Sequence, residues 1–508
     1  MLIEVKLRPD EDEAALKAHI QKRARGYKWF EIQKKSLDAR NKNEIRWVYT
    51  IRVEKEPPEK EVAEYRQTTK KPEKVVVVGS GPAGLFCAIR LIRCGIKPVI
   101  IEQGGSVEER MDANADFFQK GILDENCNVQ FGEGGAGTFS DGKLNTQTKD
   151  RRNREVLRTF VEFGAPQEIL YVSKPHIGSD RLRDVLRAMR AFIVMQGGEI
   201  RFHTFLKDIV YQDGSLKCVV LEELKSGTVY ECNASEVVLA IGHSSRKTFE
   251  MLHRRGFAME QRAFAVGVRI EHLQKNINFA QYSVAHTLLP PADYKLVSHA
   301  GERTAFTFCM CPGGVVIPAS SEKGGVVTNG MSNFLRDEEN ANSALLVQIN
   351  KSDFASNDVL SGVEYQRRLE RLAYECGGKT YKAPAQRVGD FLSGRISNRF
   401  GAVRPSYCRG VVEADLRRIL PSYVAETLKV AILDMDRKLK GFADHDAVMT
   451  GVETRFSSPV RVLRDERGES LVCRGVYPCG EGCGYSGGIT SSAADGIYIA
   501  EQISEKYM

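Results

Sequence analysis

Hydrophobic and polar residues alternate in short stretches near the start of the chain. Ile3, Val5 and Leu7 are separated by polar residues, which predicts a strand. The elements predicted after it are a helix over 11–24 and strands over 28–35 and 44–53. The order strand, helix, strand, strand predicts a small α+β domain. We place this domain at 1–58 and a charged, Pro-containing linker at 59–73.

The pattern changes at Val75. Four consecutive valines end at Gly79, which is typical of a strand buried on both faces of a parallel sheet. A helical pattern then runs from Pro82 to about Cys94, and the sequence PVIIE predicts a second buried strand that ends at Glu102. These three elements form one βαβ unit.

Further along, three alternating runs between 205 and 240, with a hairpin signal at Asp213-Gly214, predict a β-meander that ends in a buried strand. From 262 to 404 the pattern is irregular, with short strands and one clear helix near 363–376. A long helical pattern covers 412–439, and Leu420-Pro421 divides it because proline suits a helix start. A strand, a Gly-rich turn and a helix end the chain.

These patterns predict an α/β fold. Its main part is a Rossmann-like dinucleotide-binding domain with a parallel sheet and a β-meander, built from 74–255 and 405–508. A mixed α+β substrate domain is inserted at 256–404, and the small α+β domain precedes both. A chain of 508 residues is too long for one hydrophobic core, which agrees with several domains.

Composition narrows the class of protein. No apolar run approaches the roughly 20 residues needed to span a bilayer, and the first ten residues lack the apolar core of a secretory signal. We therefore expect a cytoplasmic protein without a membrane segment. The 12 Cys and 9 His show no zinc-site spacing, so reduced thiols and no metal are expected.

Net charge is +7, and residues 1–74 carry 19 Lys and Arg against 14 Asp and Glu. Such a segment suits a surface for RNA or another anionic partner, or an ordinary solvated basic face. The solvated face is the more common meaning of a basic run, so the sequence does not favour a nucleic-acid partner.

The sequence Gly79-Ser80-Gly81-Pro82-Ala83-Gly84 lies between the predicted strand and helix. In a dinucleotide-binding turn, Gly79 permits the tight turn, Gly81 lets the backbone approach a pyrophosphate, and Gly84 allows close helix–strand packing. Glu102 lies where a carboxylate accepts hydrogen bonds from a ribose, which favours FAD or NAD over NADP. The alternative is an ordinary tight turn with an exposed glutamate.

Two other stretches match the same glycine pattern, at 132–137 and 482–487. The first lacks a helical apolar face after it, and the second lacks a following strand. The sequence therefore predicts one dinucleotide fold and no second domain dedicated to NAD(P)H.

Several stretches together resemble a known family. They are VVVVGSGPAGLFCAIRL, FGEGGAGTFSDGKL, FTFCMCPGGVV and CGEGCGYSGGITSSAADG. The chain resembles the glutathione-reductase-like superfamily of FAD proteins with a single nucleotide domain. It is most similar to bacterial FAD-dependent dehydrogenases, or FAD-utilising oxidoreductases, of unknown substrate.

The resemblance implies FAD as the cofactor and adds contacts to it. Gly242 falls near the adenosine half, Gly480 and Glu481 near the ribityl chain and pyrophosphate, and Gly488 and Ile489 at the flavin's pyrimidine end. The loop 132–143 would cover the flavin or its ribityl chain, with Asp141 as a further polar candidate. The expected cofactor contacts are Gly79, Gly81, Pro82, Ala83, Gly84, Glu102, Gln103, Arg110, Gly134, Gly135, Gly137, Ser140, Lys143, Gly242, Gly480, Glu481, Gly488 and Ile489.

The expected chemistry is hydride or electron transfer between a small organic substrate and the flavin, with NAD(P)H docking at most transiently. A flavin-assisted biosynthetic or RNA-modifying enzyme and a non-catalytic nucleotide-bound sensor remain alternatives. The sequence offers several candidate redox or acid–base residues but does not identify one of them as catalytic. For the cysteines, small buried thiols are the favoured interpretation. These candidates are Cys309, Cys311, Cys479, Cys483, His243 and His286.

Overall fold

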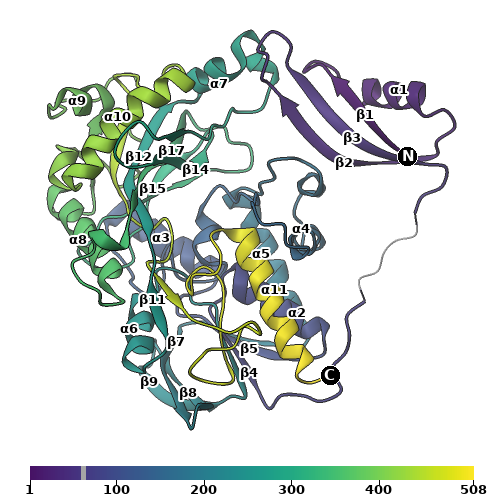
Figure 1. The fold of residues 1–508 in the computed structure, drawn as a ribbon, viewed down its shortest axis with the longest axis vertical. Helices are drawn as coiled ribbons and strands as arrows, with labels where there is room; N and C mark the ends of the chain where they lie inside the picture. Colours follow the sequence, from purple (N-terminus) through teal and green to yellow (C-terminus); the bar gives the residue numbers. More distant parts are fainter. Residues whose placement is uncertain (59–63) are drawn as a thin grey trace.

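The computed structural model describes residues 1–58 and 64–508. Its N-terminal unit contains β1 (Leu2–Leu7), α1 (Glu13–Arg23), β2 (Trp29–Asp38) and β3 (Arg46–Glu54). The strands form an antiparallel sheet in the order β1-β3-β2, and α1 covers one face through Leu16 and Ile20. The predicted order of elements is confirmed. Figure 1 shows this unit beside the rest of the molecule, which β2 meets through a backbone hydrogen bond from Lys35 N to Tyr171 O.

Part of the predicted linker, residues 59–63, lies outside the described residues. The rest of it is attached to the following domain. Thr68 N donates to Cys94 O at 3.1 Å and Thr69 N donates to Tyr507 O at 3.0 Å. The segment therefore runs along the domain surface before the first buried strand.

The next domain is organised around a five-stranded parallel sheet in the order β22-β10-β4-β5-β6. Its strands are β4 (Val75–Val78), β5 (Pro98–Ile101), β6 (Glu199–Arg201), β10 (Glu236–Leu239) and β22 (Val476–Pro478). Helices of this part are α2 (Pro82–Arg93), α3 (Val107–Lys120), α4 (Arg152–Glu162), α5 (Ser179–Met195), α6 (Arg246–Arg254) and α11 (Ile489–Glu505). The predicted βαβ unit is β4, α2 and β5.

Alternate residues of the sheet enter two different cores. Val75 and Val77 pack with α2, α5 and α11 on one face. Val76 and Val78 pack on the other face, where the meander of β7 (Thr204–Gln212), β8 (Ser215–Glu223) and β9 (Thr228–Asn233) lies with α6. The predicted meander is confirmed. Burial on both faces explains why β4 is a continuous run of valines.

A seven-stranded mixed sheet forms the second large part, in the order β13-β14-β17-β12-β20-β18-β19. Its strands are β12 (Phe264–Leu273), β13 (Val297–Ser298), β14 (Ala305–Cys311), β17 (Asn340–Ile349), β18 (Ala383–Arg387), β19 (Val411–Glu413) and β20 (Val448–Glu453). Beside it are the hairpin β15 (Val315–Pro318) and β16 (Thr328–Met331), and the helices α7 (Gln274–Tyr282), α8 (Ser361–Cys376), α9 (Val388–Ser393) and α10 (Ser422–Lys438). A two-stranded sheet, β11 (Met259–Gln261) with β21 (Val460–Val462), lies between the parts.

Three expectations are corrected here. The stretch 262–404 holds two ten-residue strands, β12 and β17, that pair along their whole length. The start of the predicted helical stretch at 412–439 is the strand β19 followed by a short 3-10 turn, and the helix begins only at Ser422. Segments β19, α10 and β20 belong to the seven-stranded part, whereas the sequence pattern predicts that all of 405–508 belongs to the nucleotide-binding domain. Alternation of apolar residues identifies a strand but not the sheet that it joins.

No helix among the described residues is long and apolar enough to cross a bilayer.

Candidate functional site

The glycine-rich turn joins β4 to α2 at the carboxyl end of the parallel sheet. Gly79 has a φ of 102°, and a Cβ atom there would lie 2.3 Å from Ala240 O. A Cβ at Gly84 would lie 1.9 Å from Gly79 O, so helix and strand pack at backbone contact. At Gly81, by contrast, a Cβ would meet no atom nearer than 3.8 Å, and no side chain caps the N-terminus of α2. The positive end of the α2 dipole therefore faces open space, which suits a phosphate.

Glu102 follows β5 and has two roles. Its carboxylate accepts hydrogen bonds from Ser80 N and Oγ at 2.8 Å, from Gly104 N at 2.9 Å and from Gly132 N at 3.0 Å. It thereby ties the turn, the end of β5 and the glycine-rich loop together. It also lines the cavity described below.

The loop 132–143 lies directly on the turn. Gly134 N donates to Ser80 O at 2.8 Å, and a Cβ at Gly135 would lie 3.1 Å from Gly81 Cα. Behind the loop, the fully buried guanidinium of Arg110 donates to carbonyl oxygens of 128–135. Burial lowers the pKa of this guanidinium to about 10. Arg110, which was expected among the cofactor contacts, does not line the cavity and instead supports the loop from behind.

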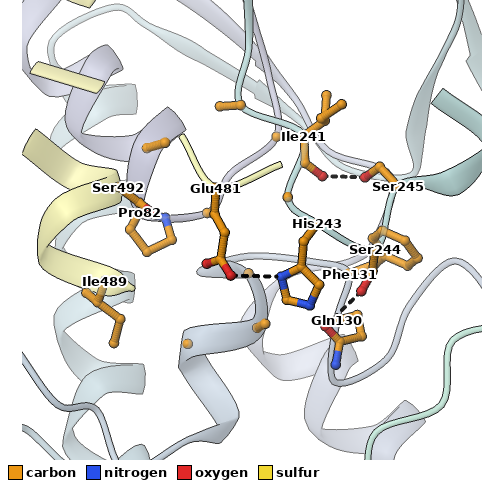
Figure 2. A pocket seen from close by; sticks show the side chains of 18 of the residues that line it. Pro82, Gln130, Phe131, Ile241, His243, Ser244, Ser245, Glu481, Ile489 and Ser492 are labelled. Atoms are coloured by element: carbon orange, nitrogen blue, oxygen red, sulfur yellow. Dashed lines mark hydrogen bonds and ion pairs between the residues drawn. The ribbon is translucent and has the colours of Figure 1, made fainter. Parts of the chain in front are cut away.

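One large cavity lies between the turn, the glycine-rich loop, the start of α11 and the edge of the seven-stranded sheet. These four parts of the protein surround about 1610 Å³ of empty space, part of which is open to solvent. Figure 2 shows Pro82 and Ile489 on one side of this space and Gln130, Phe131 and Ser244 on the other.

Most of the predicted cofactor contacts meet in this cavity. Those that line it are Gly79, Gly81, Pro82, Ala83, Glu102, Gln103, Gly135, Gly137, Ser140, Lys143, Gly242, Glu481, Gly488 and Ile489. The predicted residues outside the lining are Gly84, Arg110, Gly134 and Gly480. The glycines of this second group support the backbone. A Cβ at Gly134 would lie 2.2 Å from Thr138 Oγ1, and one at Gly480 would lie 2.8 Å from Ala83 Cβ.

Of the two histidine candidates, only one lines the cavity. His286 does not line the cavity, and its Nδ1 contacts Ser283 O at 2.8 Å. His243 lines the cavity, with Nδ1 3.3 Å from Glu481 Oε1 (Figure 2). Its buried Nε2 has no hydrogen-bond partner among residues 1–58 and 64–508. An unpaired ring nitrogen of this kind suits a hydrogen bond to a ligand.

The cysteine candidates form no disulfide. Cys311, Cys479 and Cys483 are buried, as expected, and Cys483 Sγ contacts Leu239 O at 3.2 Å. Cys309 differs, because its side chain is exposed within the cavity. The surrounding protein nevertheless raises the pKa of this thiol to about 12, so it is protonated at neutral pH.

The seven-stranded domain contributes a wall of the cavity that no local motif indicates. Side chains from that wall are Phe308, Asn329, Glu453, Arg455 and Phe456, and further lining residues without a motif are Thr204, Phe205, Leu206 and Ser244. These residues lie far along the chain from the dinucleotide turn and form no local motif. Only the packing of the two sheets brings them together.

Three family matches cover most of the chain. Residues 74–113 match the family described as FAD binding domain, and 263–456 match "FAD-dependent protein, C-terminal domain-like". Residues 1–54 match a domain of unknown function. The second match ends within a few residues of β20, in agreement with the extent of the seven-stranded part.

Among solved structures, the chain is similar to the flavin-dependent brominase Bmp2, with 12% identity, a TM-score of 0.38, and coverage of 86% of this chain and 79% of that chain. It is also similar to a geranylgeranyl bacteriochlorophyll reductase-like protein from Thermoplasma acidophilum, with 11% identity, a TM-score of 0.38, and coverage of 86% and 78%. Likeness at this level carries no information about the reaction.

A protein of Clostridium beijerinckii, named only as uncharacterized, is 46% identical over 498 residues, which is 94% of this chain and 92% of that protein. This relationship shows that the chain belongs to the same family as the Clostridium protein, and the two FAD-related family matches show that its cofactor is FAD.

Proposed function

We propose that this protein is an FAD-dependent oxidoreductase, a dehydrogenase or reductase that moves hydride or electrons between a small organic substrate and the flavin. In this proposal it is a single-nucleotide-domain member of the glutathione-reductase-like superfamily. One observation carries the proposal. The same cavity is lined by the dinucleotide turn at Gly81, by the start of α11 at Gly488, and by Phe308 and Glu453 of the seven-stranded sheet. A cofactor held by the first part therefore faces side chains of a second domain.

The residues of the cavity fit FAD. The open N-terminus of α2 at Gly81 would hold the pyrophosphate, and Glu102 with Gln103 would hold the ribose. Helix α11 begins at Ile489 after Gly488, and its positive end would stabilise negative charge at the flavin's pyrimidine end. FAD, when bound, supplies the two-electron chemistry, and the protein positions the reactants and excludes water.

NAD(P)H is proposed as at most a transient partner. The chain's other two glycine patterns do not open further βαβ units, since the first leads into a 3-10 turn at Gly135–Phe139 and the second into the final helix. We therefore expect weak binding of both nicotinamide nucleotides and slow flavin reduction by them. Submicromolar binding in isothermal titration, with rapid reduction in an anaerobic stopped-flow experiment, would contradict this expectation.

The experiment that tests the main proposal begins with the absorption spectrum of the purified protein. We expect a flavin spectrum and release of FAD, not FMN, on heating. Anaerobic mixing of the oxidised protein with a panel of alcohols and amines should reveal reduction of the flavin. Mixing of the dithionite-reduced protein with unsaturated acids should reveal reoxidation of the flavin. Flavin that exchanges electrons with no organic compound would favour a nucleotide-bound sensor, and co-purifying RNA would favour an RNA-modifying enzyme.

A further inference from the structure

A buried ion pair lies in the wall that faces the cofactor site. Glu453, the last residue of β20, is 5% exposed and lines the cavity. Its carboxylate is held in a two-pronged pair by Arg269 of β12, with Nε to Oε2 at 2.8 Å and Nη2 to Oε1 at 3.1 Å. Such a fork fixes the orientation of a carboxylate as well as its charge.

Arg269 itself has no donor left for a ligand. It is fully buried, and its remaining N–H groups donate to Cys309 O at 2.9 Å, Asn342 Oδ1 at 3.2 Å and Asn329 Oδ1 at 2.7 Å. All five donors of the guanidinium are therefore used within the protein. Arg269 is a positioning residue, and Glu453 is the member of the pair that reaches the cavity.

The backbone at this wall is also specialised. The pairing of β14 with β17 shifts register between Phe308 and Cys311, and Cys309 has a φ of 40°, which is rare for a residue with a side chain. The carbonyl of Cys309 is one of the acceptors of Arg269. A left-handed non-glycine residue held by a buried arginine beside a cavity is typical of a functional site.

The charged and titratable groups around Glu453 come from several elements. Arg269 lies on β12 and Cys309 on β14, while His243 lies after β10 and is paired with Glu481. Lys143 of the glycine-rich loop lines the same cavity, and its positive charge opposes the rise in the pKa of the Cys309 thiol. Burial raises the pKa of the Glu453 carboxyl, while Arg269 and His243 oppose that rise. This carboxyl therefore holds a proton more readily than a solvent-exposed glutamate does.

We propose that Glu453 is the catalytic acid–base residue of this cavity and that its substrates are alcohols or amines, or the carbonyl compounds or imines formed from them. This inference rests on the proposed oxidoreductase function. In the oxidation, the substrate C–H bond breaks, and bound FAD would take up its hydrogen together with the electron pair. The O–H or N–H bond breaks as the proton passes to Glu453, and a C=O or C=N double bond forms. The substrate loses two hydrogens and two electrons, and reduction is the reverse.

The rest of the wall supports this class of substrate. Arg455 donates to Glu370 through Nε and Nη2 and to Ser321 through Nη1, so each of its three nitrogens already has a partner in the protein. Phe308 and Phe456 line the cavity as an edge-to-face pair with centroids 4.5 Å apart. This aromatic surface, beside arginines that are paired within the protein, suits a compound with one polar reacting group better than a polyanion.

The test measures the midpoint potential of the bound FAD against pH, with dithionite and reference dyes, so it needs no identified substrate. A two-electron couple shifts by about 30 mV per pH unit for each proton taken up. If Glu453 takes up a proton when the cofactor is reduced, the wild-type slope should exceed that of Glu453→Gln by about 30 mV per pH unit over a window of pH. The variant should keep its FAD.

Glu271→Gln is the matched control. Glu271 is a fully buried carboxyl on β12, held by Ser406 and Asn340, with a pKa that burial also raises, but it does not line the cavity. Its slope should match the wild type. Glu453→Asp keeps a carboxyl and should keep the steeper dependence of the midpoint potential on pH. This variant provides a second comparison if the Gln variant folds poorly.

Identical slopes in wild type, Glu453→Gln and Glu453→Asp would overturn the assignment of Glu453 while leaving the oxidoreductase proposal intact. In contrast, a wild-type protein whose FAD exchanges electrons with dithionite but with no organic compound would count against the oxidoreductase function itself. Among alcohols and amines that do reduce the wild type, Glu453→Gln should be slower by about 100-fold or more.

Discussion

At the scale of single residues, Gly81 and Gly84 have different roles in the same short motif. Gly84 is needed by the fold, because any side chain there would overlap Gly79 O. Gly81 has free space beside it, so the protein alone does not require glycine at that position. A ligand would fill this space. Gly84 is therefore the glycine required by the fold, and Gly81 is the glycine that suits ligand binding.

The first prediction follows from this difference. Gly81→Val should fold normally but bind FAD about 100-fold more weakly, since loss of charge-assisted hydrogen bonds to the pyrophosphate costs about 3 kcal/mol. Circular dichroism and the flavin absorbance of the purified protein measure the two effects. Gly84→Val is the comparison, and it should lower the melting temperature as well. Full FAD occupancy in Gly81→Val would show that the phosphates lie elsewhere.

Cys309 gives a second prediction. In FAD-free protein an alkylating reagent should label Cys309 but not the buried Cys311 two residues away. Because the pKa of the Cys309 thiol is about 12, the rate should rise about tenfold per pH unit between pH 7 and 10. Bound FAD should slow this labelling.

Cys408 provides the internal control for that experiment. Its side chain is also exposed, its pKa is raised by burial to about 11, and it does not line the cavity. Peptide mass spectrometry can follow both sites in one sample. Labelling of Cys309 at the same rate with and without FAD would indicate that the cofactor does not occupy this side of the cavity.

At the scale of elements, the position of the cofactor turn depends on two helices from opposite ends of the chain. Helices α2 and α11 pack side by side on the parallel sheet (Figure 1). At their contact, a Cβ on Gly496 would lie 2.1 Å from Ala83 O, in the first turn of α2. The last helix therefore sets the position of the helix whose first turn lines the cavity.

We predict that Gly496→Ala pushes α11 away from α2. The change should lower the free energy of unfolding by about 1–3 kcal/mol, as overpacking does, and should weaken FAD binding. Thermal unfolding with and without FAD measures both effects. Gly301→Ala is the control, since its Cβ would make only ordinary contacts, the nearest at 3.6 Å. An unchanged melting temperature in Gly496→Ala would mean that the helices adjust freely.

At the scale of the whole molecule, a buried ion network joins the two large domains. Glu370 of α8 accepts hydrogen bonds from Arg246, at the start of α6, and from Arg455 after β20. Burial alone would raise the pKa of Glu370, but the two guanidinium groups hold it well below its usual range. The network lies beside the cavity, because Arg455 also lines it.

The sign of the pH effect follows from that pKa. The unfolded chain binds more protons than the folded one as pH falls, so the stabilisation by Glu370 is complete above about pH 5 and is lost progressively in acid. Glu370→Gln should lower the free energy of unfolding at pH 7 by about 3–5 kcal/mol, the cost of breaking a buried ion pair. It should also flatten the dependence on pH between about 2 and 5.

Denaturant titrations at several pH values test this prediction. Glu364→Gln is the control, because Glu364 also pairs with an arginine, Arg367, but its side chain is 59% exposed. That variant should change stability by less than about 1 kcal/mol. Equal losses in both variants would mean that the buried network does not join the domains as the structure indicates.

The sequence by itself determined the parts of the protein that depend on neighbours along the chain. The run Val75–Val78, the glycines at 79, 81 and 84, and Glu102 identified the βαβ unit and the part of the cavity wall at its turn, because each of these residues acts through local geometry. The loop around Gly135 and the start of α11 were recognised through the resemblance to known proteins.

Only the tertiary structure decided which strands join which sheet and which side chains face the cofactor from the second domain. Strand β20 looked like part of the nucleotide-binding domain but pairs with β12, and that pairing brings Glu453 to Arg269 and into the cavity. These two residues are 184 positions apart in the chain. No local pattern encodes such a contact, because it arises from the packing of whole elements and not from the preferences of the residues beside it.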